Sequence, residues 1–295
     1  MDDLNLVVDK GAIFGFLGPN GAGKTTTVRI LTGLSQPTRG QAWVMGEVVA
    51  PALASLRSKI GYLPEEPAFY HWMTGREFLT YVGELFHLPS RENKKRCDEL
   101  LEFADLKEAA SRRIGGYSRG MRQRLALAQA LINRPQVLFL DEPCSALDPI
   151  GRREVLDAIF QLKGQATVFM STHILADVER ICDVVGIIDG GQLVIEEKTE
   201  VLRRRFAKPI FNLHLEGESN SLVQVLRSLP WVLKVEEEHR GNEAMLHIHV
   251  NDVTMAKREL PRVLVESGLT LLHYELTSPS LEEVFIQLMG NRVKE

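Results

Sequence analysis

The pattern of apolar and polar residues along the first two thirds of the chain predicts an α/β domain. Short, continuous apolar runs, typical of strands buried on both faces, alternate with amphipathic segments of helical period. We expect strands over 4–8, 12–18, 60–63, 137–140 and 166–170, a turn and strand over 35–49, and a hairpin over 183–197. Helical patterns cover 24–34, most of 74–133, and 150–164. This order predicts a parallel sheet interrupted by a helical insertion.

From about residue 206 the order of elements changes. The expected elements are strands over 210–215, 231–237, 243–249 and 269–276, and helices over 219–228, 252–267 and 279–289. A βαββαβ order is typical of a ferredoxin-like α+β domain. We therefore expect a first domain over 1–205, with a helical subdomain at about 66–133, and an accessory domain over 206–295.

Composition narrows the possible classes of protein. The chain has 295 residues, of which 44% are hydrophobic and 25% charged, as in soluble globular proteins. No apolar run approaches the ~18 residues of a membrane span, and the start "MDDLNL" lacks the basic segment of a signal peptide. Its three cysteines follow no metal-binding spacing. Scattered cysteines without a span or signal peptide lead us to expect a cytoplasmic protein. The net charge of −4 gives no overall field that attracts nucleic acid, so we expect no nucleic-acid partner.

A glycine-rich loop after the strand at 12–18 predicts binding of a nucleoside triphosphate. The residues that match G-x-x-x-x-G-K-[ST] are Gly18, Pro19, Asn20, Gly21, Ala22, Gly23, Lys24 and Thr25, and we include the next residue, Thr26. The motif follows a buried strand and opens a helix, as it requires. Its backbone N–H groups wrap the β-phosphate, Lys24 reaches the β- and γ-phosphates, and the Thr25 hydroxyl is a ligand of Mg²⁺.

Polar residues also follow two other buried strands. Asp141 and Glu142 end the run "VLFLDEP", at the strand end where α/β sheets bind ligands. We expect Asp141 to hold the water shell of Mg²⁺ and Glu142 to polarise an attacking water. His173 follows the strand at 166–170; by position alone it is equally an ordinary surface residue or a neutral donor to the γ-phosphate.

A second anion-binding pattern lies in "GGYSRGMRQRLALAQAL" at 115–131, where small residues precede a basic helix. The ordered set of phosphate loop, "YSRGM", "LFLDEP", "SALD" and "STH" resembles the ATP-binding cassette family over residues 1 to about 200. This resemblance implies a head-to-tail dimer, with itself or a paralogous subunit, in which each ATP lies between two chains. Ser118 and Gly120 would then serve the partner's γ-phosphate, and Asp148 of "SALD" would signal across the dimer.

Several positions depart from the family pattern. The common signature Leu-Ser-Gly-Gly-Gln is changed at Tyr117, Arg119 and Met121. Glu65 stands where the family has a glutamine that contacts Mg²⁺; a carboxylate still accepts a water ligand there but adds negative charge. No aromatic residue precedes Phe14, so the chain looks short at its N-terminus, and we expect adenine stacking to be lost or supplied otherwise.

The altered signature, Glu65 and the C-terminal "PSLEEVFIQLMG" together resemble the ATPase subunits of ABC-2 type exporters. That branch implies a separate membrane permease, a location on the cytoplasmic face of the membrane, and a helical insertion at about 66–117 that grips the permease. The aromatic side chains of "AFYHWM" at 68–73 are equally consistent with such a contact and with the core.

Two other functions remain open from the sequence. One is a soluble cassette ATPase acting on nucleic acid or ribosomes, although such relatives usually have tandem cassettes or a long coiled coil. The other is a module that senses ATP without hydrolysing it. His247 and His249 alternate on one strand, but without a third ligand nearby a solvated strand face is a better interpretation than a metal site.

Overall fold

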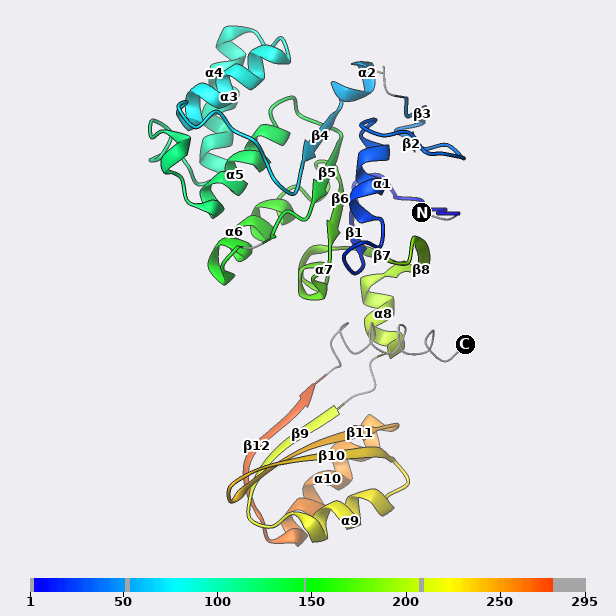
Figure 1. Cartoon of the computed structure of the whole chain (residues 1–295). Coiled ribbons are helices and arrows are strands. Elements are labelled where there is room, and N and C mark those ends of the chain that lie inside the picture. The colour runs from blue at the N-terminus through cyan, green and yellow to red at the C-terminus, as the bar shows by residue number, and fades with distance from the viewer. Residues whose placement is uncertain (1–2, 51–53, 146, 207–209, 278–295) are drawn as a thin grey trace. The chain divides into compact units, whose positions relative to one another are not determined.

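The computed structural model describes residues 3–50, 54–145, 147–206 and 210–277 (Figure 1). By its internal contacts the chain divides into two compact units, Met1–Thr199 and Glu200–Glu295. Each unit has its own sheet and its own helices, so each is described by itself.

A six-stranded sheet forms the centre of the first unit. Its strands are β1 (Ile13–Leu17), β4 (Ile60–Leu63), β5 (Val137–Asp141), β6 (Thr167–Thr172), β7 (Val184–Asp189) and β8 (Gln192–Lys198). They lie in the order β4-β5-β6-β1-β7-β8. All neighbouring pairs are parallel except β7 and β8, which form the expected hairpin. The predicted parallel sheet is therefore confirmed.

Helices cover both faces of this sheet. The helices that pack against it include α1 (Lys24–Leu31), α2 (Ala54–Arg57) and α7 (Leu175–Ile181), and α6 (Pro149–Phe160) packs against α7. Alternate residues of β1 turn to opposite faces: Phe14 and Phe16 share a core with Val28 of α1, whereas a side chain on Gly15 would collide with Val178 of α7. Helix α1 thus covers one face of β1 and α7 covers the other.

The insertion between β4 and β5 is helical, as expected, and consists of α3 (Gly75–Leu85), α4 (Ser90–Phe103), the short 3₁₀ helix η1 (Ile114–Gly116) and α5 (Arg119–Ala130). The Thr74 hydroxyl accepts the Glu77 N–H while the Glu77 carboxylate accepts the Thr74 N–H, a reciprocal cap that fixes the start of α3. Ser118 caps α5 by accepting the Met121 N–H.

The strand predicted over residues 4–8 is wrong. Residues 4–9 form no strand in the structure, although Leu4, Leu6 and Val8 pack against the core that contains Phe14. The alternating pattern therefore reports side-chain burial, not strand pairing, and both edges of β1 are already occupied by β6 and β7. The strand expected within 35–49 is instead a small hairpin of β2 (Trp43–Val44) and β3 (Glu47–Val48).

The second unit contains α8 (Thr199–Phe206, whose first residue still belongs to the first unit), β9 (Ile210–Glu216), α9 (Asn220–Ser228), β10 (Val232–Arg240), β11 (Glu243–Val250), α10 (Val253–Ser267) and β12 (Thr270–Thr277). Its antiparallel sheet has the order β10-β11-β9-β12, with Phe211, Leu213 and Leu215 of β9 packed against residues of α9 and α10. From β9 onward this is the predicted βαββαβ order. The helix expected over 279–289 lies outside the described residues.

Candidate functional site

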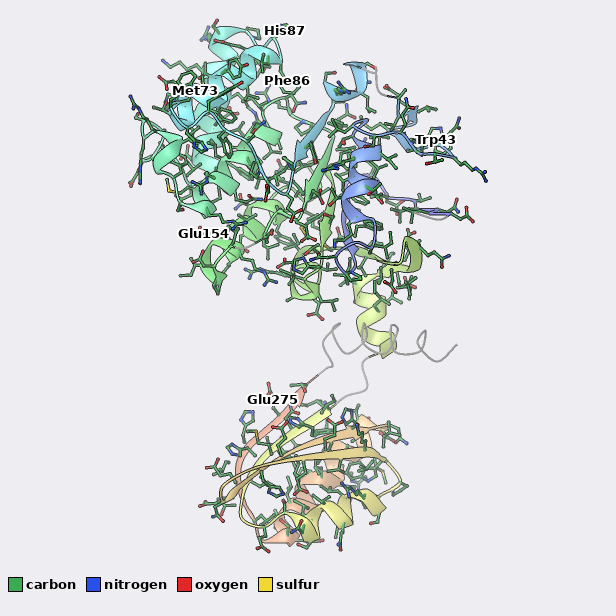
Figure 2. All side chains as sticks on the ribbon, viewed as in Figure 1. Trp43, Met73, Phe86, His87, Glu154 and Glu275 are labelled. Atoms are coloured by element: carbon green, nitrogen blue, oxygen red, sulfur yellow. The ribbon has the colours of Figure 1, made fainter. Side chains whose placement is uncertain are left out.

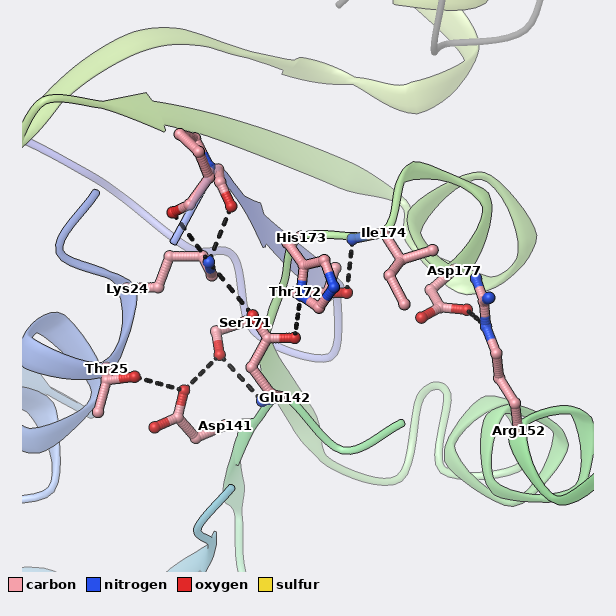
Figure 3. Close-up of polar contacts among 12 residues, drawn as sticks. Lys24, Thr25, Asp141, Glu142, Arg152, Ser171, Thr172, His173, Ile174 and Asp177 are labelled. Atoms are coloured by element: carbon pink, nitrogen blue, oxygen red, sulfur yellow. Dashed lines mark hydrogen bonds and ion pairs between the residues drawn. The ribbon is translucent and has the colours of Figure 1, made fainter. Parts of the chain in front are cut away.

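Three strand ends meet at one edge of the first sheet (Figure 3). Asp141 at the end of β5 pairs in register with Ser171 of β6, and Leu17 at the end of β1 pairs with Thr172. Parallel strands place their carboxyl ends at the same edge, where open α/β sheets bind ligands. The glycine loop after β1, the acidic residues after β5 and His173 after β6 therefore converge, as the sequence predicted.

The glycine loop turns the chain from β1 into α1. Gly21 and Gly23 have φ of +84° and +108°, in the left-handed region that favours glycine. Gly18 is packed so closely that a Cβ would lie 2.3 Å from the Ile188 carbonyl oxygen. This conformation leaves Lys24 as the first residue of α1, where unpaired backbone N–H groups of a helix favour an anion.

Lys24 is buried and surrounded by oxygen atoms. Its ammonium group donates to the carbonyl oxygens of Gly18 and Pro19, at 2.8 and 3.2 Å. It also lies 3.2 Å from Oε1 of Glu142, and both side chains are less than a tenth exposed. In this structure, therefore, the expected phosphate-binding ammonium and the expected base form an ion pair.

Glu142 occupies an uncommon backbone conformation, with a φ of +49°. A non-glycine residue in this region carries strain of about 1–3 kcal/mol, and such residues cluster at functional sites. Its N–H donates to Ser171, which holds the turn directly after β5. Oε2 of Glu142 lies 2.9 Å from Nδ1 of the half-exposed His173. If Nδ1 donates to Glu142, a neutral imidazole has no second proton, so His173 cannot donate to a phosphate at the same time.

Thr25 and Asp141 place two hard oxygen ligands side by side. The Thr25 hydroxyl donates to Oδ1 of Asp141 at 3.3 Å, and the Ser171 hydroxyl donates to the same oxygen at 2.6 Å. Such a pair fits Mg²⁺, which usually takes one or two carboxylates together with substrate phosphates. The described residues contain no group of three His, Cys, Asp or Glu side chains that could hold a metal without such a substrate.

Ser171 is a site residue that the sequence reasoning missed. Its side chain is fully buried, and its hydroxyl links Asp141 to the backbone of Glu142. Its position at the end of a buried strand, two residues before His173, is the feature of the sequence that could have identified it as a site residue.

The second anion-binding pattern forms a separate hollow of about 350 Å³ at the start of α5. Its lining residues include Ser118, Arg119, Gly120, Asp148 and Ile150. Tyr117, which departs from the common signature, is buried and donates from its hydroxyl to the Ala109 carbonyl oxygen at 2.7 Å. Tyr117 therefore supports the packing of the helical insertion and leaves Ser118 at the surface.

Most of the remaining candidate residues are exposed to solvent. Thr26 and Glu65 are exposed, and Glu65 takes part in no hydrogen bond or ion pair with the described residues. Tyr70 and Trp72 are exposed, whereas Phe69 packs edge-on against Phe78. The two histidines on β11 hold no metal cluster in the described chain; Nδ1 of His247 instead lies 2.7 Å from Oδ1 of Asn212.

Fold and site together define the class of protein: a P-loop nucleotide-binding domain carrying an inserted helical subdomain. The family model described as ABC transporter matches residues 1–145, and the model for the C-terminal domain of DrrA1-3-like ATP-binding proteins matches residues 198–289.

Curated relatives align over nearly the whole chain. An ABC transporter ATP-binding protein of Bacillus subtilis, YxlF, is 41% identical over 96% of this chain and 92% of its own length. The daunorubicin resistance ATP-binding protein DrrA2 of Streptomyces coeruleorubidus is 36% identical over 100% and 91%. The bacitracin transport ATP-binding protein BcrA of Bacillus licheniformis is 35% identical over 98% and 92%.

Solved structures of ATP-binding subunits and cassettes are also similar to this chain. The ATP-binding subunit of an ABC transporter is 32% identical with a TM-score of 0.61, covering 68% of this chain and 84% of that chain. A dimeric ATP-binding cassette bound to ADP and phosphate is 25% identical with the same TM-score, covering 66% and 89%. The chain therefore belongs to the ATP-binding subunits of ABC transporters, in the exporter branch, and is an ATPase. Among its described helices, none combines the length and apolar composition of a membrane span.

Proposed function

We propose that this chain closes head to tail with a second copy, or with a paralogous subunit, around two ATP molecules. The observation that carries the proposal is the separation of two anion-binding surfaces. The hollow lined by Ser118, Gly120 and Asp148 shares no hydrogen bond or ion pair with Lys24 among the described residues. Ile150 beside it is 70% exposed, an apolar surface that a partner chain would cover.

In this dimer the residues of one chain bind and orient the triphosphate. Lys24 leaves Glu142 and takes the β- and γ-phosphates, and Thr25 and Asp141 would hold Mg²⁺. The ion would supply neutralisation of the phosphate charge as the bond to the γ-phosphate breaks. Freed from Lys24, the Glu142 carboxylate accepts a proton from the attacking water, and His173 keeps that carboxylate oriented.

The partner chain completes the site. The Ser118 hydroxyl already accepts the Met121 N–H, so its own proton remains available for a phosphate oxygen. The backbone N–H of Gly120, in the first turn of α5, faces the same anion with the favourable end of the helix dipole.

We further propose that the dimer drives export through a separate membrane permease and sits on the cytoplasmic face of the membrane. The exposed rings of Tyr70 and Trp72, in the segment that leads into the helical insertion, provide an apolar contact for a permease loop. A hollow of about 260 Å³, lined among others by Leu34, Tyr62 and Phe86, lies where the insertion meets the sheet and could receive that loop.

Size-exclusion chromatography of the Glu142→Gln variant tests the dimer. The amide keeps the size of the side chain but cannot take the proton, so MgATP should be bound without cleavage and the dimer should persist. The same variant with MgADP should elute as a monomer.

The control adds Ser118→Arg, which blocks the hollow and leaves the phosphate loop unchanged. This double variant should bind MgATP as a monomer. If it still dimerises with ATP, the start of α5 is not a shared phosphate site.

A further inference from the structure

A buried ion pair joins the two helices that follow the functional loops. Nε of Arg152, in the first turn of α6, lies 2.6 Å from Oδ1 of Asp177, in the first turn of α7 (Figure 3). The Asp177 side chain is 1% exposed and that of Arg152 is 29% exposed. Burial raises the pKa of the Asp177 carboxyl above its usual range, and Arg152 opposes this rise. Arg152 is thus the partner that allows a charged group to lie here.

Each end of this pair is fixed to a loop of the site. On α6, the Arg152 N–H donates to the carbonyl oxygen of Asp148, the exposed residue that lines the hollow. On α7, the Asp177 N–H donates to the carbonyl oxygen of Ile174, and the Ile174 N–H is capped by the Thr172 hydroxyl. These bonds fix the residues directly before and after His173.

The contacts form a chain from the hollow to the site. Asp148 is bonded to Arg152 and Arg152 to Asp177, and α7 begins next to His173, whose Nδ1 lies 2.9 Å from Oε2 of Glu142. The Glu142 carboxylate is close enough to contribute to the raised pKa of the Asp177 carboxyl, after the larger effect of burial. A shift of Asp148 can therefore reach His173 through the ion pair.

We propose that Arg152 and Asp177 are positioning residues that set the Glu142–His173 pair according to the position of Asp148. The inference rests on the proposed function, in which a partner chain covers Asp148. When the partner moves this residue, α6 carries Arg152 with it, and the ion pair moves the start of α7 and thereby His173. The two residues are not catalytic; they act through the position of His173.

Steady-state ATP hydrolysis by Asp177→Asn tests the proposal, because this change removes the charge and leaves no buried carboxylate unpaired. We expect kcat to fall about tenfold, within the usual range of coupling between sites, while the Kd for MgADP stays within twofold. Arg152→Gln should lower kcat by a similar factor, the double variant by no more than either single variant, and Arg152→Lys by less.

The matched control is Asp157→Asn. Oδ1 of Asp157 pairs with Arg180 at 2.8 Å, so this exposed pair joins the same two helices by the same chemistry further from the loops. Its loss should leave kcat within twofold. An equal fall of kcat in Asp157→Asn would mean that the two pairs only hold the helices together, and would overturn the proposal.

A second readout separates positioning from packing. Asp148→Ala should lower kcat in the unchanged chain but have little further effect in Asp177→Asn, because the Asp148 side chain receives the partner's contact and the ion pair passes it on to His173. If the double variant loses kcat by the product of the two single losses, the proposal is overturned. An unaltered kcat in Asp177→Asn would overturn it as well. Size-exclusion chromatography tests the proposed dimer separately. If Glu142→Gln stays monomeric with MgATP, both proposals are overturned. If only this inference fails, that dimer still forms.

Discussion

The Glu142→Gln variant should bind MgADP more tightly than the unchanged chain does. In the structure Lys24 is held by Glu142 at 3.2 Å, with both groups buried, and nucleotide binding must break this contact. Two unit charges at that distance attract by about 5 kcal/mol at an effective dielectric constant of 20, before the cost of desolvation is subtracted. The net value of such a charge-assisted contact is about 1.5–3 kcal/mol.

Only part of that free energy is released by the substitution. The Gln amide oxygen still offers a dipole to the Lys24 ammonium, but the attraction between two opposite charges is lost, so we take about half of the contact's free energy to be removed. The competition therefore weakens by about 1–1.5 kcal/mol, which is a five- to twelvefold lower Kd for MgADP. ADP is the appropriate ligand because we expect no dimer with it, so that titration calorimetry reports binding to the single chain.

His173→Ala is the matched control. It removes the other contact of Glu142, at Oε2, and leaves the ion pair between Lys24 and Oε1 in place. Its Kd for MgADP should stay within about twofold of the unchanged chain. An unchanged or higher Kd in Glu142→Gln would refute the reasoning, because it would mean that Lys24 does not have to leave Glu142 when nucleotide binds.

Two other predictions address the phosphate loop and the permease contact. Lys24→Ala removes the only ammonium group in the loop and leaves Glu142 buried without it, so calorimetry should detect little MgATP binding and turnover should be lost; retained affinity would count against the loop. Trp72→Ala should reduce the amount of membrane subunit that co-purifies with the tagged chain while ATP turnover is unchanged. Trp43→Ala, which removes another exposed indole on β2 (Figure 2), should leave the amount of co-purified membrane subunit unchanged, and an equal loss in both variants would argue against the contact.

The convergence of the candidate residues could be predicted from sequence because it depends on topology alone. Buried apolar runs identify parallel strands, and the carboxyl ends of such strands share one edge of the sheet. Asp141 and His173 follow two such runs, so their proximity required no knowledge of side-chain conformation. The βαββαβ order of the second unit was readable for the same reason, since its strands alternate and its helices are amphipathic.

Features that depend on three-dimensional packing could not be predicted. Residues 4–8 alternate as a strand would, but whether they pair depends on the edges of β1, which later segments of the chain occupy. The sequence marks Tyr117 only as a departure from a motif, because its role depends on its hydrogen bond to Ala109 and its packing against Gly75. The left-handed turn at Glu142 carries no glycine to mark it.

The ion pair between Lys24 and Glu142 also bears on how hydrolysis is controlled. While Lys24 lies 3.2 Å from Oε1 of Glu142, that oxygen is not free to accept a proton from an attacking water. A triphosphate offers Lys24 several negative charges in exchange for one, so binding removes this restraint from Glu142. On this reasoning the nucleotide releases the base that cleaves it, and the partner chain supplies the remaining contacts through Ser118 and Gly120. Free ATPase activity without a partner should therefore be limited by the missing half of the site, with Glu142 already released once ATP is bound.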